Sequence, residues 1–224
     1  MIPWVKLGTA EVSGGQLRLM QRGREFSIML GSNELMNSRL SGSEEALATL
    51  SCDRIKGHRE PSVLVGGLDM GFTLRATLNA LGEDSTVTVA ELVPTVVTWA
   101  RGPMAGVFDG CLDDPRVAVV EQDVAHLIET NKAAFDAILL DVDNGPDGLT
   151  QETNAALYSV EGLRTAKAAL RPKGVLSVWS SGPDRHFTGR LKKAGFTVEE
   201  VKVRATGKGR GARHVIWIAV NDQG

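Results

Sequence analysis

The sequence contains little cysteine, a single tyrosine and no marked excess of either charge. Its two cysteines, Cys52 and Cys111, lie far apart without metal-ligand spacing, so we interpret them as buried thiols of a reducing compartment. The 25 basic and 27 acidic side chains leave a net charge of −2, which shows no global bias toward nucleic acid or an anionic membrane. No apolar run approaches the ~18 residues of a spanning helix, and the N-terminal residues lack the segments of a signal peptide. We therefore expect a cytoplasmic protein without membrane contact.

Several catalytic motifs are also missing. The four histidines show no paired ligand spacing, so no metal is expected. The chain has no Gly-x-Ser-x-Gly elbow and no Walker lysine motif. The glycine-rich basic segment 204–213 lacks an interleaved aromatic residue, and we interpret it as a solvated hairpin loop rather than an RNA site. Nucleic acid is therefore not an expected partner.

From residue 61 onward, short β-branched runs alternate with helical patterns. The expected strands are 63–65, 86–90, 117–120, 137–140 and 175–179, and the expected helices are roughly 72–81, 95–101, 124–131, 152–170 and 185–194. Short, continuously apolar strands favour a parallel sheet that is covered by helices on both faces. Residues 196–203 and 214–220 predict an antiparallel C-terminal hairpin. The pattern predicts a doubly wound, mostly parallel seven-stranded α/β sheet, typical of class I S-adenosylmethionine-dependent methyltransferases.

The first sixty residues follow a different pattern. Residues 16–20 and 25–30 predict a β-hairpin, and a helix is expected from Ser43, as its N-cap, to about Cys52. A chain of 224 residues fits one large domain with a small appendage. We therefore divide it into a β-hairpin/helix region, 1–57, and a Rossmann-like S-adenosylmethionine-binding domain, 58–224. The N-terminal region is too short to bury much core alone, so we expect it to supply a dimer contact or a partial lid.

A glycine-rich turn lies between the first strand and the first helix of the larger domain. Gly66, Gly67 and Gly71 would let a ligand approach the backbone, and the helix start offers free N–H groups. Leu68 stands where a dinucleotide fingerprint requires its second glycine, so a nucleoside without phosphates fits better than a pyrophosphate. The alternative is a merely tight strand-to-helix turn.

Acidic residues follow four strands of the predicted sheet. Glu91 ends the second strand, where a carboxylate can accept both ribose hydroxyls, and Asp123 after the third could accept from an adenine amino group. Asp69 lies in the glycine turn, and Asp141 ends the fourth strand. Because ligands of open α/β sheets bind outside the carboxyl ends of the strands, these four acids together predict a nucleoside site. Taken singly, each could be a solvated or capping carboxylate.

These segments resemble the spermidine synthase (polyamine aminopropyltransferase) family. The resemblance rests on residues 63–71, 89–92, 122–123 and 135–141. It implies that Asp69 holds the aminopropyl end of decarboxylated S-adenosylmethionine, Glu91 the ribose and Asp123 the adenine. It also implies that Asp141 helps to deprotonate the attacking amine. Further expected cofactor contacts are Gly66, Gly67, Gly71, Leu92 and Val124, and the expected substrate-binding residues are Asp143 and Asp147.

The chain departs from that family in three places. Leu68 and Met70 make the turn poorer in glycine, the proline after the fourth strand is displaced to Pro146, and the only tyrosine is Tyr158, far from the family's Tyr-His-Glu segment. We therefore expect a transferase, dimeric in the manner of the family, that moves an aminopropyl group from the cofactor to a small amine. A methyltransferase using S-adenosylmethionine and a nucleoside-binding protein without catalysis remain alternatives. The sequence does not identify the acceptor.

Overall fold

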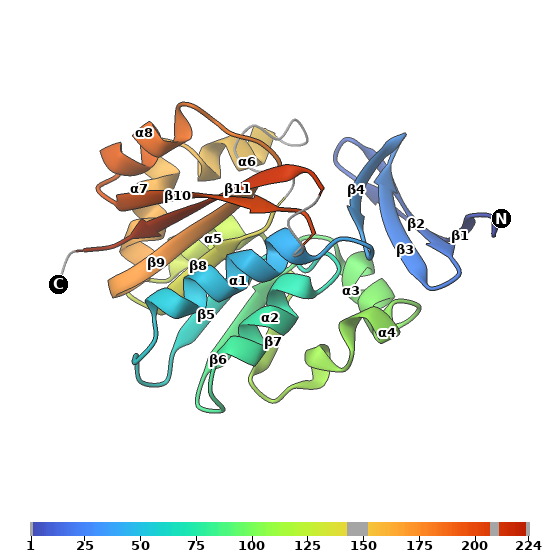
Figure 1. Ribbon diagram of the computed structural model, residues 1–224, viewed down its shortest axis with the longest axis horizontal. Coiled ribbons are helices and arrows are strands. Elements are labelled where there is room, and N and C mark those ends of the chain that lie inside the picture. The colour runs from blue at the N-terminus through green and yellow to red at the C-terminus, as the bar shows by residue number, and fades with distance from the viewer. Residues whose placement is uncertain (1, 143–151, 207–210, 223–224) are drawn as a thin grey trace.

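A computed structural model describes residues 2–142, 152–206 and 211–222, and the larger of its two sheets has seven strands (Figure 1). Along the sheet the order is β10-β11-β9-β8-β5-β6-β7. The strands are β5 (Ser62–Gly66), β6 (Thr86–Ala90), β7 (Val117–Val120), β8 (Phe135–Leu140), β9 (Leu170–Ser180), β10 (Thr197–Arg204) and β11 (Arg213–Val220). Strands β5 to β9 pair in parallel, and β11 runs antiparallel between β9 and β10. The predicted seven-stranded α/β fold with its C-terminal antiparallel hairpin is confirmed.

Helices cover both faces of this sheet (Figure 1). They are α1 (Gly42–Arg54), α2 (Phe72–Ala80), α3 (Pro94–Arg101), α4 (Ala105–Phe108), α5 (Val124–Thr130), α6 (Glu152–Leu157), α7 (Val160–Ala169) and α8 (Phe187–Lys193), with a 3-10 turn at Cys111–Asp113. Val63 and Val65 of β5 join one buried cluster with α1, α2 and α3, whereas Leu64 between them joins a second cluster with α5, α7 and α8. Because successive side chains of a strand point to opposite faces, an uninterrupted apolar run is buried on both sides.

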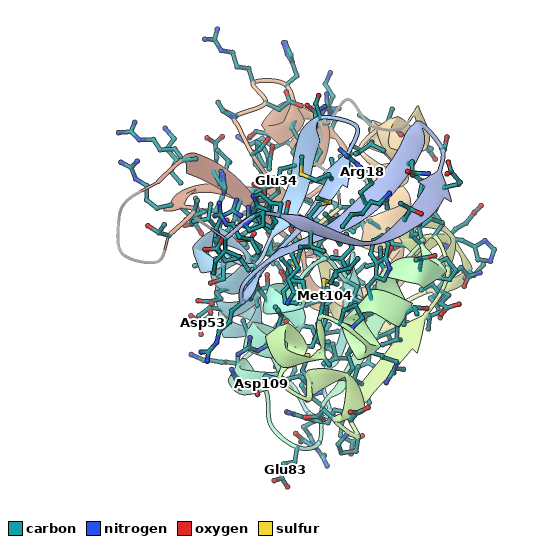
Figure 2. The ribbon with its side chains drawn as sticks, turned by 90° about the vertical axis from the view of Figure 1, so that its right-hand side faces the viewer. Arg18, Glu34, Asp53, Glu83, Met104 and Asp109 are labelled. Atoms are coloured by element: carbon teal, nitrogen blue, oxygen red, sulfur yellow. The ribbon has the colours of Figure 1, made fainter. Side chains whose placement is uncertain are left out.

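The N-terminal region forms a separate four-stranded antiparallel sheet. Its strands, in spatial and chain order, are β1 (Val5–Val12), β2 (Gly15–Arg22), β3 (Glu25–Leu30) and β4 (Asn33–Asn37). The predicted hairpin is its central pair, and the outer strands were missed. Buried Leu19 and Ile28 belong to the same apolar cluster as Trp99 of α3, so this sheet packs against the helical layer of the larger domain. Figure 2 shows it in front of the rest of the molecule, with Arg18 and Glu34 on it.

Helix α1 joins the N-terminal sheet to the larger one. Its N-cap is Ser41, without a side-chain capping bond, rather than Ser43 as the sequence suggested. The Ser43 hydroxyl instead contacts Glu44 and His214, which a local capping pattern cannot reveal. Both cysteines are free and buried, as expected. No helix within the described ranges is long and apolar enough to cross a membrane.

Candidate functional site

The carboxyl ends of β5, β6 and β8 meet at one edge of the larger sheet. Backbone hydrogen bonds continue the ladder one residue beyond these strands: Gly67 N donates to Ala90 O at 2.9 Å, and Asp141 N donates to Gly66 O at 2.9 Å. Glu91 N donates to Val120 O, at the end of β7, at 3.0 Å. These hydrogen bonds hold the glycine turn between two residues: Glu91, which directly follows β6, and Asp141, which directly follows β8.

Two glycines of the turn are required by close packing. Gly67 has a φ of 95°, and a Cβ there would lie 2.3 Å from the carbonyl oxygen of Asp141. Gly71 has a φ of 76°, and its Cβ would lie 2.5 Å from the ring of Phe108. Left-handed backbone and missing space both exclude a side chain. Gly67 therefore brings the turn against the end of β8, and Gly71 brings it against Phe108 of α4, whether or not a ligand is bound.

Glu91 is held by the turn that it faces. It is only 8% exposed, its Oε2 accepts from Leu68 N at 3.1 Å, and its Oε1 accepts from Val93 N at 2.8 Å. Two hydrogen bonds from backbone amides fix the orientation of this carboxylate. A buried anion is thereby presented at the strand end, where the sequence predicted a ribose-binding group.

Asp123 is the N-cap of α5, and its Oδ1 accepts from Ala125 N at 2.8 Å. Asp123 is therefore a capping carboxylate, the alternative role that the sequence left open for each of the four acids. Asp123 nonetheless lines the same cavity as Glu91, so capping and ligand binding do not exclude each other. The buried side chain of Val124 fills the space beside Gly66, where a Cβ would lie 2.9 Å from Cγ2 of Val124.

A first cavity, cavity 1, lies between the strand ends and the N-terminal sheet. Of the predicted cofactor-binding residues, those that line it are Gly67, Asp69, Glu91, Leu92, Asp123 and Val124. Gly66 and Gly71 do not line it. The opposite wall includes Leu17, Leu30 and Met36 of the N-terminal sheet. The cavity therefore combines apolar walls with four carboxylates at its sheet edge, those of Asp69, Glu91, Asp123 and Asp141.

Asp141 lies where cavity 1 meets a second cavity, cavity 2. It is 5% exposed, and Thr73 Oγ1 donates to its Oδ2 at 2.6 Å. Burial, with a contribution from the charge of Glu44, raises the pKa of Asp141 to about 7, although the Thr73 bond opposes the shift. A carboxylate with a pKa near neutrality is suited to accept a proton and release it again.

Cavity 2 joins the predicted site residues Asp69 and Asp141 to residues that the sequence did not single out. The residues that line it are Leu35, Met36, Asn37, Leu40, Glu44, Leu68, Asp69, Met70, Phe72, Thr73, Asp141, Trp179, Ser181 and His214. Three are carboxylates, and none of the described lining residues is lysine or arginine. Tyr158 packs edge-on against Phe187 and lines neither cavity. The predicted substrate residues Asp143 and Asp147 lie outside the described residues.

Known proteins share both the sequence and the fold of this chain. Residues 44–187 match the spermine/spermidine synthase domain. Polyamine aminopropyltransferase 1 of Streptomyces coelicolor is 33% identical over 131 residues, covering 58% of this chain and 24% of that protein. The polyamine aminopropyltransferase of Mycobacterium tuberculosis is 36% identical over 125 residues, covering 54% of this chain and 23% of that protein. The aligned part therefore spans about a quarter of these curated relatives.

Solved structures support the same fold. Spermidine synthase from Thermotoga maritima superposes with a TM-score of 0.74 at 19% identity, over 96% of this chain and 72% of that chain. A spermidine synthase in complex with the transition-state analogue AdoDATO gives a TM-score of 0.73 at 18% identity, over the same 96% and 72%. In the described part of the chain, no group of His, Cys, Asp and Glu side chains is arranged to hold a metal ion.

Proposed function

This chain belongs to the spermine/spermidine synthase family, and on that premise we propose that it is an aminopropyltransferase. Its donor would be decarboxylated S-adenosylmethionine and its acceptor a small amine. The observation that carries the proposal is the position of Asp141, a buried carboxylate at the meeting point of two cavities. Asp69, Glu91, Asp123 and Asp141 all fall within the family match, residues 44–187.

Cavity 1 suits the donor. Glu91 would accept hydrogen bonds from the ribose hydroxyls, and Asp123 with Val124 would face the adenine. Asp69 lines both cavities, so its carboxylate would attract the ammonium at the aminopropyl end, close to Asp141. When bound, the donor supplies a carbon made electrophilic by the neighbouring sulfonium.

Asp141 would orient the acceptor nitrogen and take its proton. An amine is protonated at neutral pH, so it must lose a proton before it can attack. The carboxylate attracts the ammonium and then accepts that proton. A carbon–nitrogen bond forms while the carbon–sulfur bond breaks, and methylthioadenosine leaves with the sulfur. Alignment of the two reactants in adjoining cavities would supply much of the acceleration.

Ligand-induced thermal shifts test the donor assignment. A ligand that binds only the folded protein stabilises it by mass action. We expect methylthioadenosine and decarboxylated S-adenosylmethionine to raise the melting temperature more than S-adenosylmethionine does, because Asp69 repels the extra carboxylate. Asp69→Asn should reduce the difference in melting temperature between the complexes with decarboxylated S-adenosylmethionine and with S-adenosylmethionine. Asp53→Asn is the control and should leave that difference unchanged, because Asp53 is a half-exposed residue of α1 that lines neither cavity. A clear preference for S-adenosylmethionine would favour a methyltransferase instead.

We also propose that the chain forms a homodimer through its N-terminal sheet. β1 is an edge strand with Val5 54% and Leu7 41% exposed, and Ile2 and Trp4 next to it are also exposed. An edge strand with exposed apolar side chains is suited to pair with another chain. Light scattering at micromolar concentration should give twice the chain mass, and Val5→Glu/Leu7→Glu should give the monomer. A monomeric native chain would contradict this proposal.

A further inference from the structure

A second carboxylate lines cavity 2 together with Asp141. Glu44, near the start of α1, lines this cavity, and its charge contributes to the raised pKa of Asp141. Burial also raises the pKa of Glu44 itself. Thr73 lies between them: its Oγ1 donates to Oδ2 of Asp141 at 2.6 Å and approaches the backbone oxygen of Glu44 at 3.5 Å. Two carboxylates that line one cavity oppose each other's ionisation, and a cation bound in that cavity removes the penalty.

Hydrogen bonds hold the Glu44 side chain in place. Ser43 Oγ donates to Oε2 of Glu44 at 2.7 Å and lies 2.8 Å from Nδ1 of His214 on β11. A hydroxyl has one proton, so when Ser43 donates to Glu44 it accepts from His214, and Nδ1 carries the hydrogen. Trp179 of β9 packs edge-on against the imidazole, with ring centroids 4.8 Å apart. The carboxylate of Glu44 on α1 is therefore held through Ser43 by His214 of β11, and Trp179 of β9 packs against that histidine.

The remaining walls of cavity 2 suit a hydrocarbon chain that carries a positive charge. Leu35, Met36, Leu40, Phe72 and Trp179 supply apolar surface. Trp179 is only 9% exposed, and its indole face can also attract a cation. The groups that can titrate around Glu44 are Asp69, Asp141 and His214 in the cavity, and Glu45 on the same helix. The carboxylates that line the cavity are those of Glu44, Asp69 and Asp141, so the cavity selects a cation over an anion.

We propose that Glu44 is a specificity-determining residue, which holds the ammonium group of the acceptor together with Asp141, and that Ser43 and His214 are positioning residues that orient Glu44. The inference rests on the proposed aminopropyl transfer, and it assigns three residues of this chain to the binding of the acceptor. Ser43 and His214 lie outside residues 44–187, so the family match does not extend to them. Neutral nucleophiles such as alcohols would gain nothing from the second carboxylate.

Calorimetric titration of 1,4-diaminobutane into protein saturated with methylthioadenosine tests the role of Glu44. Glu44→Gln should weaken amine binding at least about tenfold, the effect of losing a charge-assisted hydrogen bond, and leave methylthioadenosine affinity unchanged. Glu45→Gln is the matched control: it makes the same change at an exposed neighbour that does not line the cavity, and should stay within about twofold of the native protein.

The outcomes separate this inference from the proposed function. If the native protein fails to bind methylthioadenosine, the proposed function falls, and this inference falls with it. If methylthioadenosine binds but the diamine does not, or binds equally well to Glu44→Gln, only the role of Glu44 is overturned.

A double-mutant cycle tests the positioning residues. Ser43→Ala and His214→Phe, which keeps a ring against Trp179, should each raise KM for the amine several-fold and leave kcat within about twofold. In the Glu44→Gln background neither change should have a further effect, because residues that act through one another are not additive. Additive losses, or a fall in kcat without a change in KM, would show general damage to the site and overturn the positioning role.

Discussion

Replacing Asp141 with asparagine should slow turnover about 10²-fold or more while leaving methylthioadenosine affinity largely unchanged. Asparagine keeps the shape of the side chain and can still accept the 2.6 Å hydrogen bond from Thr73, but it cannot accept the proton of the amine. The measurement is single-turnover transfer to 1,4-diaminobutane, with calorimetry of methylthioadenosine on the same preparation. Near-normal turnover would leave Asp141 with a structural role only.

The pH dependence of kcat/KM gives the same base an independent signature. The free protein holds the pKa of Asp141 at about 7, above its ordinary value, because the group is buried and faces Glu44. The base must be deprotonated, so kcat/KM should rise as pH increases through about 7. The amine itself titrates far higher, near ~10. Thr73→Val removes the hydrogen bond that lowers this pKa, so the rise should move to higher pH.

Replacing Glu91 with alanine should weaken methylthioadenosine binding by about 10²-fold or more. Hydrogen bonds to a charged group are worth roughly 1.5–3 kcal/mol each, and the proposed site uses two of them for the ribose. Because the carboxylate also accepts from Leu68 N and Val93 N, the variant should melt at a lower temperature. Binding must therefore be measured well below that temperature.

Glu121→Ala is the matched control for this variant. Glu121 follows β7, is exposed and lines neither cavity, so its loss should leave methylthioadenosine affinity unchanged. A folded Glu91→Ala protein with native affinity would place the nucleoside elsewhere.

The sheet and its acidic edge could be predicted because both follow from local sequence patterns. Residues 63–65 of β5 and 137–140 of β8 are continuously apolar, as strands buried on both faces must be, and each run is followed directly by residues of the predicted site. Parallel strands bring those residues to one edge, so Asp69, Glu91, Asp123 and Asp141 could be grouped without any knowledge of distances.

The rest of the site depends on contacts between distant parts of the chain. Ser43 and His214 are 171 residues apart, and nothing in either segment announces their hydrogen bond. Glu44 has the appearance of an ordinary acid in the first turn of a helix, and His214 that of an ordinary strand histidine. β1 was missed because its apolar residues Val5 and Leu7 are exposed rather than part of a recognisable buried face. Thr73 could have been suspected, since it lies in the first turn of the helix that follows the glycine turn.

The most direct test of the central claim is transfer itself. The native protein is incubated with decarboxylated S-adenosylmethionine and 1,4-diaminobutane, and the products are followed by mass spectrometry. The account predicts methylthioadenosine and a diamine extended by one aminopropyl group, formed in equal amounts and much more slowly by Asp141→Asn. Absence of both products, or a methylated amine when S-adenosylmethionine is supplied instead, would contradict it.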